Sequence, residues 1–132
     1  MIDHIDHLVL TTAKESECVD FYIRVLRMKL ESFMGGTPLV ERKAFKFGNQ
    51  KINLHIQGKE FEPKANTPTP GSLDLCFITD RSIAEVIANL QKENWPIIEG
   101  PVIRTGATSK INSIYVRDPD QNLIEISEIL DI

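Results

Sequence analysis

The chain has 132 residues, which is enough for one domain with a hydrophobic core and too few for two ordinary ones. Hydrophobic residues at 42% and charged residues at 26% are typical of globular proteins and exclude disordered and fibrous classes. The net charge of -4 argues against a nucleic-acid partner, because domains that bind the phosphate backbone usually carry a basic surface.

No apolar run approaches the roughly 20 residues needed to cross a bilayer, and residues 1–4 lack the basic start of a signal peptide. We therefore expect a cytoplasmic protein with no membrane partner. Cys18 and Cys76 have neither metal-finger nor redox spacing, so both are expected to be free thiols.

The first half of the chain alternates between strand and helix patterns. Its predicted elements are a strand at 5–11, a helix at 14–26 and strands at 29–33, 42–47 and 51–56. In the first strand, period-two alternation places His7, Val9 and Thr11 on one face and Leu8 and Leu10 on the other.

The second half repeats this order after a connector rich in proline and glycine. Its predicted elements are a strand at 73–79, a helix at 82–93 and strands at 97–104, 111–117 and 123–127. The sequence thus predicts an α+β fold in which two βαβββ modules form a cup-shaped mixed sheet. Module one covers residues 1–57, the connector 58–71 and module two 72–132, all within a single domain.

The opening strands of the two modules resemble each other. His7 and Asp74 each begin an alternating run that ends in threonine, and they lie about half the chain length apart. Such a spacing is typical of a duplicated unit.

Polar side chains alternate with the aliphatic, helix-facing residues of four strands. We expect their faces to form a concave surface that contains His7, Asn53, His55, Asp74, Cys76, Glu125 and Ser127. Two carboxylates close together are costly unless a cation offsets them. Two imidazoles with two carboxylates suit Fe, Mn, Co, Ni or Zn better than Ca²⁺, which prefers oxygen ligands.

Several of these residues also have a purely structural explanation. His55 is also explained as a hydrogen-bonded structural residue, and Asp74 as a satisfied polar residue or a general base beside a three-ligand site. Cys76 is expected to be a small buried residue and not a nucleophile, since no base is specified beside it. Arg104 begins a glycine loop that either holds a substrate anion or stabilises its own turn.

Three segments carry a resemblance to a known family. Residues 6–10 (DHLVL), 21–28 (FYIRVLRM) and 115–125 (YVRDPDQNLIE) resemble the vicinal oxygen chelate superfamily, which includes glyoxalase I, bleomycin resistance proteins and extradiol dioxygenases. The resemblance covers nearly the whole chain, and the RDPD-x-NLIE ending is its most specific part. Among its subgroups, the chain looks most like the short glyoxalase-domain proteins.

The resemblance implies that the first, fourth, fifth and eighth strands supply metal ligands, here His7, His55, Asp74 and Glu125. Relative to glyoxalase I, His55 and Asp74 exchange the usual order of carboxylate and histidine. The implied reaction is that of a lyase or isomerase acting through a metal-stabilised enediolate, with Glu125 as ligand and catalytic base. Asn53 and Arg104 are the predicted substrate-binding residues.

Two other functions remain open. One is an Fe(II) extradiol-type dioxygenase, and the other is a non-catalytic protein that binds a small molecule, as resistance proteins do. The binding protein would be either metal-free or metal-bound. For the enzyme we expect a divalent metal ion of unknown identity as cofactor, a small-molecule substrate as partner and a homodimer, because family members of this length usually pair.

Overall fold

The computed structural model describes residues 1–131 and contains two compact units, Met1–Gly71 and Ser72–Ile132, which we describe separately. Each unit holds one four-stranded mixed sheet and one helical segment, as expected of βαβββ modules. No helix within residues 1–131 is both long and apolar enough to cross a membrane.

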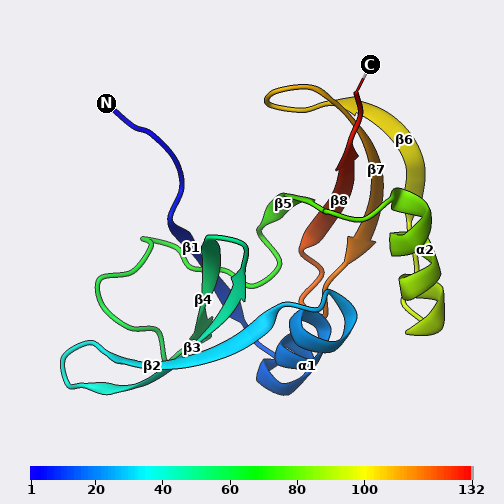
Figure 1. Cartoon of the computed structure of the whole chain (residues 1–132). Helices are drawn as coiled ribbons and strands as arrows, with labels where there is room; N and C mark the ends of the chain where they lie inside the picture. Colours follow the sequence, from blue (N-terminus) through cyan, green and yellow to red (C-terminus); the bar gives the residue numbers. More distant parts are fainter. Residues whose placement is uncertain (132) are drawn as a thin grey trace. The chain divides into compact units, whose positions relative to one another are not determined.

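The first unit contains five elements in the predicted order. They are β1 (His7–Thr12), a helical segment made of α1 (Glu15–Asp20) and η1 (Phe21–Val25), β2 (Lys29–Gly35), β3 (Val40–Phe47) and β4 (Gln50–Ile56). The strands lie in the order β1-β4-β3-β2, with β1 parallel to β4 and the remaining pairs antiparallel (Figure 1).

The predicted helix at 14–26 changes its winding halfway. It begins as an α-helix and continues from Phe21 as a π-helix, in which the Leu26 amide donates to the Phe21 carbonyl at 3.0 Å. The wider turn presents Phe21, Tyr22 and Val25 to the core, and all three are buried. Tyr22 stacks on Phe45 of β3 with ring centroids 4.9 Å apart, which anchors the helical segment to the aliphatic face of this sheet.

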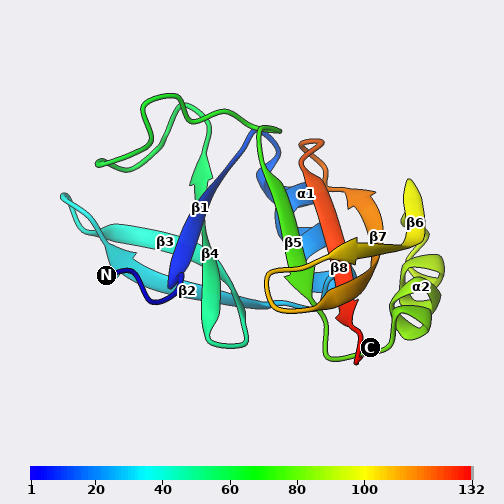
Figure 2. The same ribbon diagram turned by 90° about the horizontal axis from the view of Figure 1, so that it is seen from above.

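The second unit repeats the topology. It contains β5 (Asp74–Ile78), α2 (Ile83–Lys92), β6 (Glu99–Thr105), β7 (Lys110–Arg117) and β8 (Leu123–Ile129). Figure 2 shows these strands in the order β5-β8-β7-β6, which matches the first unit position for position. The prediction of two similar βαβββ modules is therefore confirmed.

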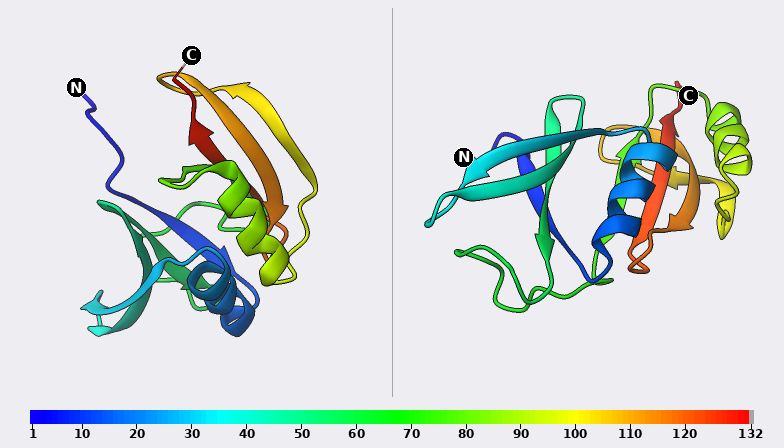
Figure 3. Two further views of the ribbon diagram at one scale, coloured as in Figure 1. Left: turned by 45° about the vertical axis from the view of Figure 1, so that its right-hand side comes forward. Right: turned by 90° about the horizontal axis from the view of Figure 1, so that it is seen from below.

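Helix α2 lies against one face of its sheet, as the left-hand view of Figure 3 shows. Ser82 caps it by accepting from the Glu85 amide at 3.2 Å, and Glu128 of β8 accepts from the Ile83 amide at 3.0 Å. Ile83 and Leu90 are buried, as are Ile124 and Ile126 on the inward face of β8. The aliphatic face of β8 thus packs in the core together with α2, and its polar face is left free.

A buried hydrogen-bond network closes the turn between β7 and β8. Asp118 accepts from the Asn122 amide at 2.9 Å, the Asn122 side chain at 2.8 Å and the Asp120 amide at 3.0 Å. Asn122 in turn accepts from the Leu73 amide at 2.9 Å, just before β5. The most specific part of the sequence motif therefore has a structural role, since it holds β5 in place beside β8.

Replacing Asn122 by alanine should lower the free energy of unfolding by roughly 2–3 kcal/mol, because it removes the acceptor of the Leu73 amide and one of the donors to the buried Asp118 carboxylate. Urea denaturation followed by circular dichroism measures the change. Asn66→Ala is the matched control, because Asn66 is exposed and bonds only to Thr67. Equal stabilities of the two variants would contradict a structural role for the network.

Candidate functional site

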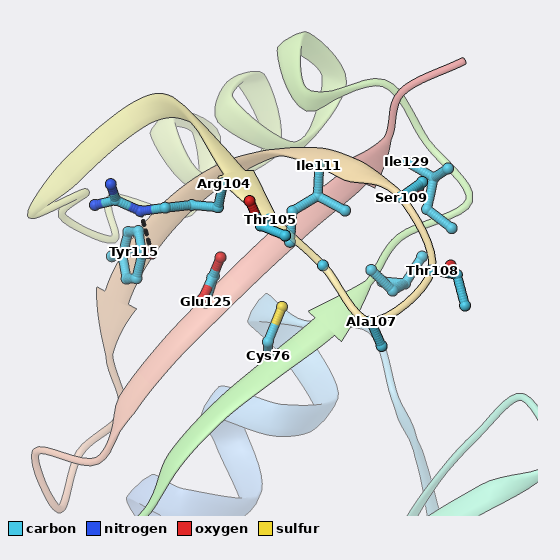
Figure 4. Close-up of a pocket in the computed structure, with 12 residues that line it drawn as sticks. Cys76, Arg104, Thr105, Ala107, Thr108, Ser109, Ile111, Tyr115, Glu125 and Ile129 are labelled. Carbon is cyan, nitrogen blue, oxygen red and sulfur yellow. Dashed lines mark hydrogen bonds between the residues drawn. The ribbon is translucent and has the colours of Figure 1, made fainter. Parts of the chain in front are cut away.

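The polar face of the second unit borders a hollow of about 470 Å³. Strands β5, β6, β7 and β8 and the loop after β6 supply the residues that line it (Figure 4). Its size lies within the range typical of small-molecule sites. Two residues singled out by the sequence, Glu125 and Arg104, line this hollow.

Glu125 lies in the middle of a row that crosses the sheet. The strand register places Cys76 of β5 on one side of it and Tyr115 of β7 on the other. Its Oε2 atom accepts from the Ser127 hydroxyl at 3.4 Å, and Ser127 also bonds to Ser113 at 2.7 Å. Strand pairing on both sides therefore fixes the carboxylate at the floor of the hollow.

Cys76 is exposed, so the expectation that it is a buried core residue is wrong. The reason is that β5 lies at the edge of its sheet and turns Cys76 toward the hollow. Desolvation of the sulfur is the main cause that raises the pKa of the Cys76 thiol. The hydrogen bond with Ser127 opposes this effect, and the smaller influences of the Glu125 and Asp74 charges raise the pKa further. A thiol held in the neutral form is a poor nucleophile.

The Arg104 guanidinium is held above this floor. Its Nε atom donates to the Tyr115 hydroxyl at 3.0 Å (Figure 4). Its Nη2 atom donates to Glu99 at 3.4 Å. The bond to Tyr115 and the charge of Glu99 raise the pKa of Arg104, so the group stays cationic. Within residues 1–131, the Nη1 atom has no partner and can receive a substrate oxygen.

The loop after Arg104 stabilises its own turn. The Gly106 amide donates to the Ser109 carbonyl at 2.8 Å, and a Cβ at Gly106 would lie only 2.8 Å from that same oxygen. Lys110 donates to the Thr105 hydroxyl at 2.9 Å. The glycine therefore serves loop closure, and the anion-binding capacity of this segment lies in the Arg104 side chain.

Asp74 lies on the same face as Glu125 but not directly beside it. Its partner in the strand register is Leu123, two residues before Glu125. Asp74 and Glu125 are therefore diagonal neighbours on two parallel strands, and both charges act on Cys76. Asp74 is exposed, so solvent satisfies its carboxylate.

His7 stands at the start of β1 in the first unit. Its Nδ1 atom lies 2.8 Å from the Asp6 carboxylate, and this hydrogen bond lowers the pKa of Asp6. Because an ionised carboxylate only accepts hydrogen bonds, Nδ1 carries a proton in this hydrogen bond, and Nε2 is the nitrogen that faces away from Asp6. Metal-binding histidines commonly have a carboxylate partner of this kind on the second nitrogen.

His55 is buried on β4, beneath a ring from the connector. Phe61 packs edge-on against it with centroids 5.5 Å apart. Burial lowers the pKa of His55, and the charge of Arg42 lowers it further, against a smaller opposing effect of Glu60. His55 is therefore neutral near pH 7.

The strand register separates His7 from His55. In the parallel pair, His7 lies opposite Lys51, Val9 opposite Asn53 and Thr11 opposite His55. At about 3.3 Å per residue, His55 lies roughly 13 Å farther along the sheet than His7. Asn53 is thus nearer to His7 than His55 is.

The four predicted metal ligands are divided equally between the units. Across residues 1–131, no three histidine, cysteine, aspartate or glutamate side chains form a group that could hold a metal ion. The set of His7, His55, Asp74 and Glu125 therefore stays a prediction.

Sequence reasoning missed four residues beside the predicted ones, namely Asp6, Arg42, Phe61 and Tyr115. Asp6 is out of phase with His7 along the strand, yet adjacent residues still pair at a strand end. Tyr115 is visible in the sequence two residues before the RDPD motif, in phase with the polar face. Phe61 gives no signal in the sequence, because it lies in a connector without periodicity.

The stability of the protein should fall as the pH drops from 7 toward 5. The unfolded state binds a proton at His55 near the ordinary pKa of 6.5, whereas the folded state binds it only at lower pH. The loss should therefore begin near pH 6.5 and level off below the folded pKa. Urea denaturation at several pH values measures it, and His55→Gln should flatten the slope.

His4→Gln is the control for this titration, because His4 is exposed and bonds only to the neighbouring Asp3. Its slope between pH 7 and 5 should match that of the wild type. An unchanged slope in His55→Gln would show that burial does not perturb this histidine.

Comparisons with known proteins identify the family. Residues 4–126 match the model of the Glyoxalase/Bleomycin resistance protein/Dioxygenase superfamily. The chain is 56% identical over 128 residues to the virulence protein STM3117 of Salmonella typhimurium, covering 97% of this chain and 85% of that protein. It is 54% identical over 127 residues to the glyoxalase domain-containing protein RDO1 of Mycosarcoma maydis, covering 96% and 69%.

Solved structures agree in fold. The crystal structure of STM3117 superimposes with a TM-score of 0.91 at 54% identity, covering 98% of this chain and 99% of that one. Lactoylglutathione lyase from Agrobacterium tumefaciens has a TM-score of 0.72 at 20% identity over 97% of this chain and 95% of its own, which is a likeness of fold alone. Because the family model matches residues 4–126, which is nearly the whole chain, the chain belongs to the Glyoxalase/Bleomycin resistance protein/Dioxygenase superfamily.

Proposed function

We propose that the chain is a metal-dependent enzyme of the glyoxalase type, a lyase or isomerase that moves a proton from a carbon next to a carbonyl group. The observation that carries this proposal is the Glu125 carboxylate at the floor of a hollow of about 470 Å³, with Arg104 above it. A base and an anion-binding group that line the same hollow are what proton abstraction beside a carbonyl requires.

Glu125 is the proposed general base. It takes the proton from the substrate carbon and returns it to the neighbouring one, so that the carboxylate is regenerated in each turnover. Arg104 holds an anionic oxygen of the substrate through Nη1, while Tyr115 and Glu99 fix the orientation of the guanidinium. Cys76, with its raised pKa, takes no part as a nucleophile.

The proposed metal ligands are His7, His55, Asp74 and Glu125. Two observations support the donor chemistry: His7 presents Nε2 with Asp6 on its other nitrogen, and His55 is neutral. When bound, a divalent cation would supply Lewis-acid stabilisation of negative charge on two neighbouring substrate oxygens. In the register of β1 and β4, His55 lies farther from His7 than Asn53 does. Metal binding by His55 therefore has to be tested beside metal binding by Asn53.

Two alternatives belong to other function classes. An Fe(II) extradiol-type dioxygenase would consume oxygen with catechol after loading with iron. The second alternative is a protein that binds a small molecule without turnover. It is favoured by the polar face of the first unit, where Lys51 lies between His7 and Lys46, because binding through positive charge requires no catalytic base. We also retain the proposals of a cytoplasmic location and a homodimer, for which the mass in solution is the test.

Glu125→Gln should lower kcat at least about 100-fold, because the amide cannot accept the substrate proton. The assay follows the loss of hemithioacetals formed from methylglyoxal or phenylglyoxal with a panel of small thiols. Glu128→Gln is the matched control, since it lies on the same strand, faces α2 and keeps an oxygen for the Ile83 amide. Equal turnover by both variants would remove Glu125 from the mechanism.

Metal analysis of the purified protein should find a stoichiometric divalent ion that is lost in His7→Ala. His4→Ala should retain it, because His4 has the same kind of carboxylate neighbour but precedes the strand. Asp74→Ala, Glu125→Ala and His55→Ala test the rest of the set, and Asn53→Ala tests the residue nearer to His7. A wild-type protein free of divalent metal, or one that keeps its metal in His7→Ala, would contradict the proposed site.

A further inference from the structure

The polar face of the first unit concentrates positive charge in an acidic protein. The register aligns His7, Lys51, Lys46 and Lys29 directly opposite one another across all four strands. Like charges directly opposite are destabilising. Within residues 1–131, none of these three lysines forms an ion pair. Three rows of residues run across the four strands on this face, beginning at His7, Val9 and Thr11 of β1, and Glu31 is the one carboxylate in them.

Two aromatic rings lie among these cations. The Lys51 ammonium sits 4.1 Å from the centroid of Phe33 on β2, and the Arg42 guanidinium sits 4.0 Å from the centroid of Phe61. Phe61 also contacts His55 edge-on. The face therefore offers flat apolar surfaces beside positive charges, with small Ala44 buried between them.

Two buried polar atoms of this cluster have no partner. They are the Nε atom of Arg42, which is a donor, and the Oδ1 atom of Asn53, which is an acceptor. Leaving such an atom buried and unpaired costs roughly 1–3 kcal/mol. Arg42 itself forms no ion pair within residues 1–131, so none of the described carboxylates neutralises its guanidinium.

The backbone is shaped to hold Arg42 where it is. Its guanidinium lies over the turn after β2, where a Cβ at Gly36 would collide with Nη2 and a Cβ at Gly35 would lie 3.3 Å from Nε. Gly36 also has a φ of +85°, which side chains other than glycine rarely adopt. Both glycines thus make room for a cation that has no ion-pair partner within residues 1–131.

We propose that this face binds a flat anionic small molecule, such as an aromatic carboxylate. Its anionic group lies between Arg42 and Lys51, and its ring packs against Phe33 and Phe61. The inference goes beyond the proposed reaction and does not depend on it, because neither Glu125 nor a metal ion takes part in the binding described here.

Calorimetric titration of the full chain with sodium benzoate, benzamide and sodium acetate tests the proposal. Benzoate should bind with a Kd on the order of 1 mM, as expected of a ligand of this size. Benzamide lacks the charge and acetate lacks the ring, so each should bind at least about tenfold more weakly. Equal binding of benzoate and benzamide, or no saturation with benzoate, would overturn the proposal.

Arg42→Met, Lys51→Met and Phe61→Leu should each weaken benzoate binding at least about fivefold. The matched control is Lys43→Met, because Lys43 lies next to Arg42 on β3, faces the other side and pairs with Glu15 at 3.2 Å. Thermal melts check that each variant is folded, and Arg42→Lys, which keeps the charge, provides a second test should Arg42→Met unfold. Unchanged benzoate affinity in folded Arg42 and Lys51 variants would refute the site.

Glu125→Gln separates this inference from the proposed function. It should abolish turnover and leave benzoate binding unchanged, because Glu125 lies in the other unit's sheet. Loss of benzoate binding in Glu125→Gln would overturn the assignment to the first unit alone.

Discussion

The alternation of side chains along each strand is the constraint on which the structure depends. One face of each sheet is aliphatic and packs against a helical segment, through Tyr22 on Phe45 in the first unit and through Ile83 and Leu90 in the second. Burial of that face supplies the favourable free energy of folding. The opposite face does not pack in the core, so it can carry charges and unpaired donors that a core would not tolerate.

The fold was predictable because its signals are local and repeated. Period-two strands, two amphipathic helices and a connector rich in proline set the order of elements, and the similarity of the segments at His7 and Asp74 indicated the duplication. The π-helical half of the first helix was not predictable, since π and α turns share the same apolar spacing over a few residues. The exposure of Cys76 was missed as well, because a strand's edge position is a property of the sheet and not of the strand's sequence.

The candidate site was predictable only in part, for a related reason. Alternation correctly placed Glu125 and Asp74 on one face, but it does not fix the register between strands, and register decides which residues are neighbours. In the first unit, register places Lys51 and not His55 opposite His7, with Asn53 closer than His55. Long-range pairings such as Arg42 with Phe61 leave no periodic trace, so only coordinates reveal them.

The two polar faces have opposite chemical character, although their strands follow the same order. The face in the second unit has carboxylates at Asp74 and Glu125 and one fixed guanidinium, whereas the face in the first unit has a row of lysines, Arg42 and two aromatic rings. Duplication explains the shared topology but not this divergence. Since aligned lysines and unpaired buried atoms lower stability, folding alone gives no reason to keep them. A bound anion would offset the charges of the lysines and give the Arg42 Nε donor a partner, so the pattern of charges on this face favours a role in binding.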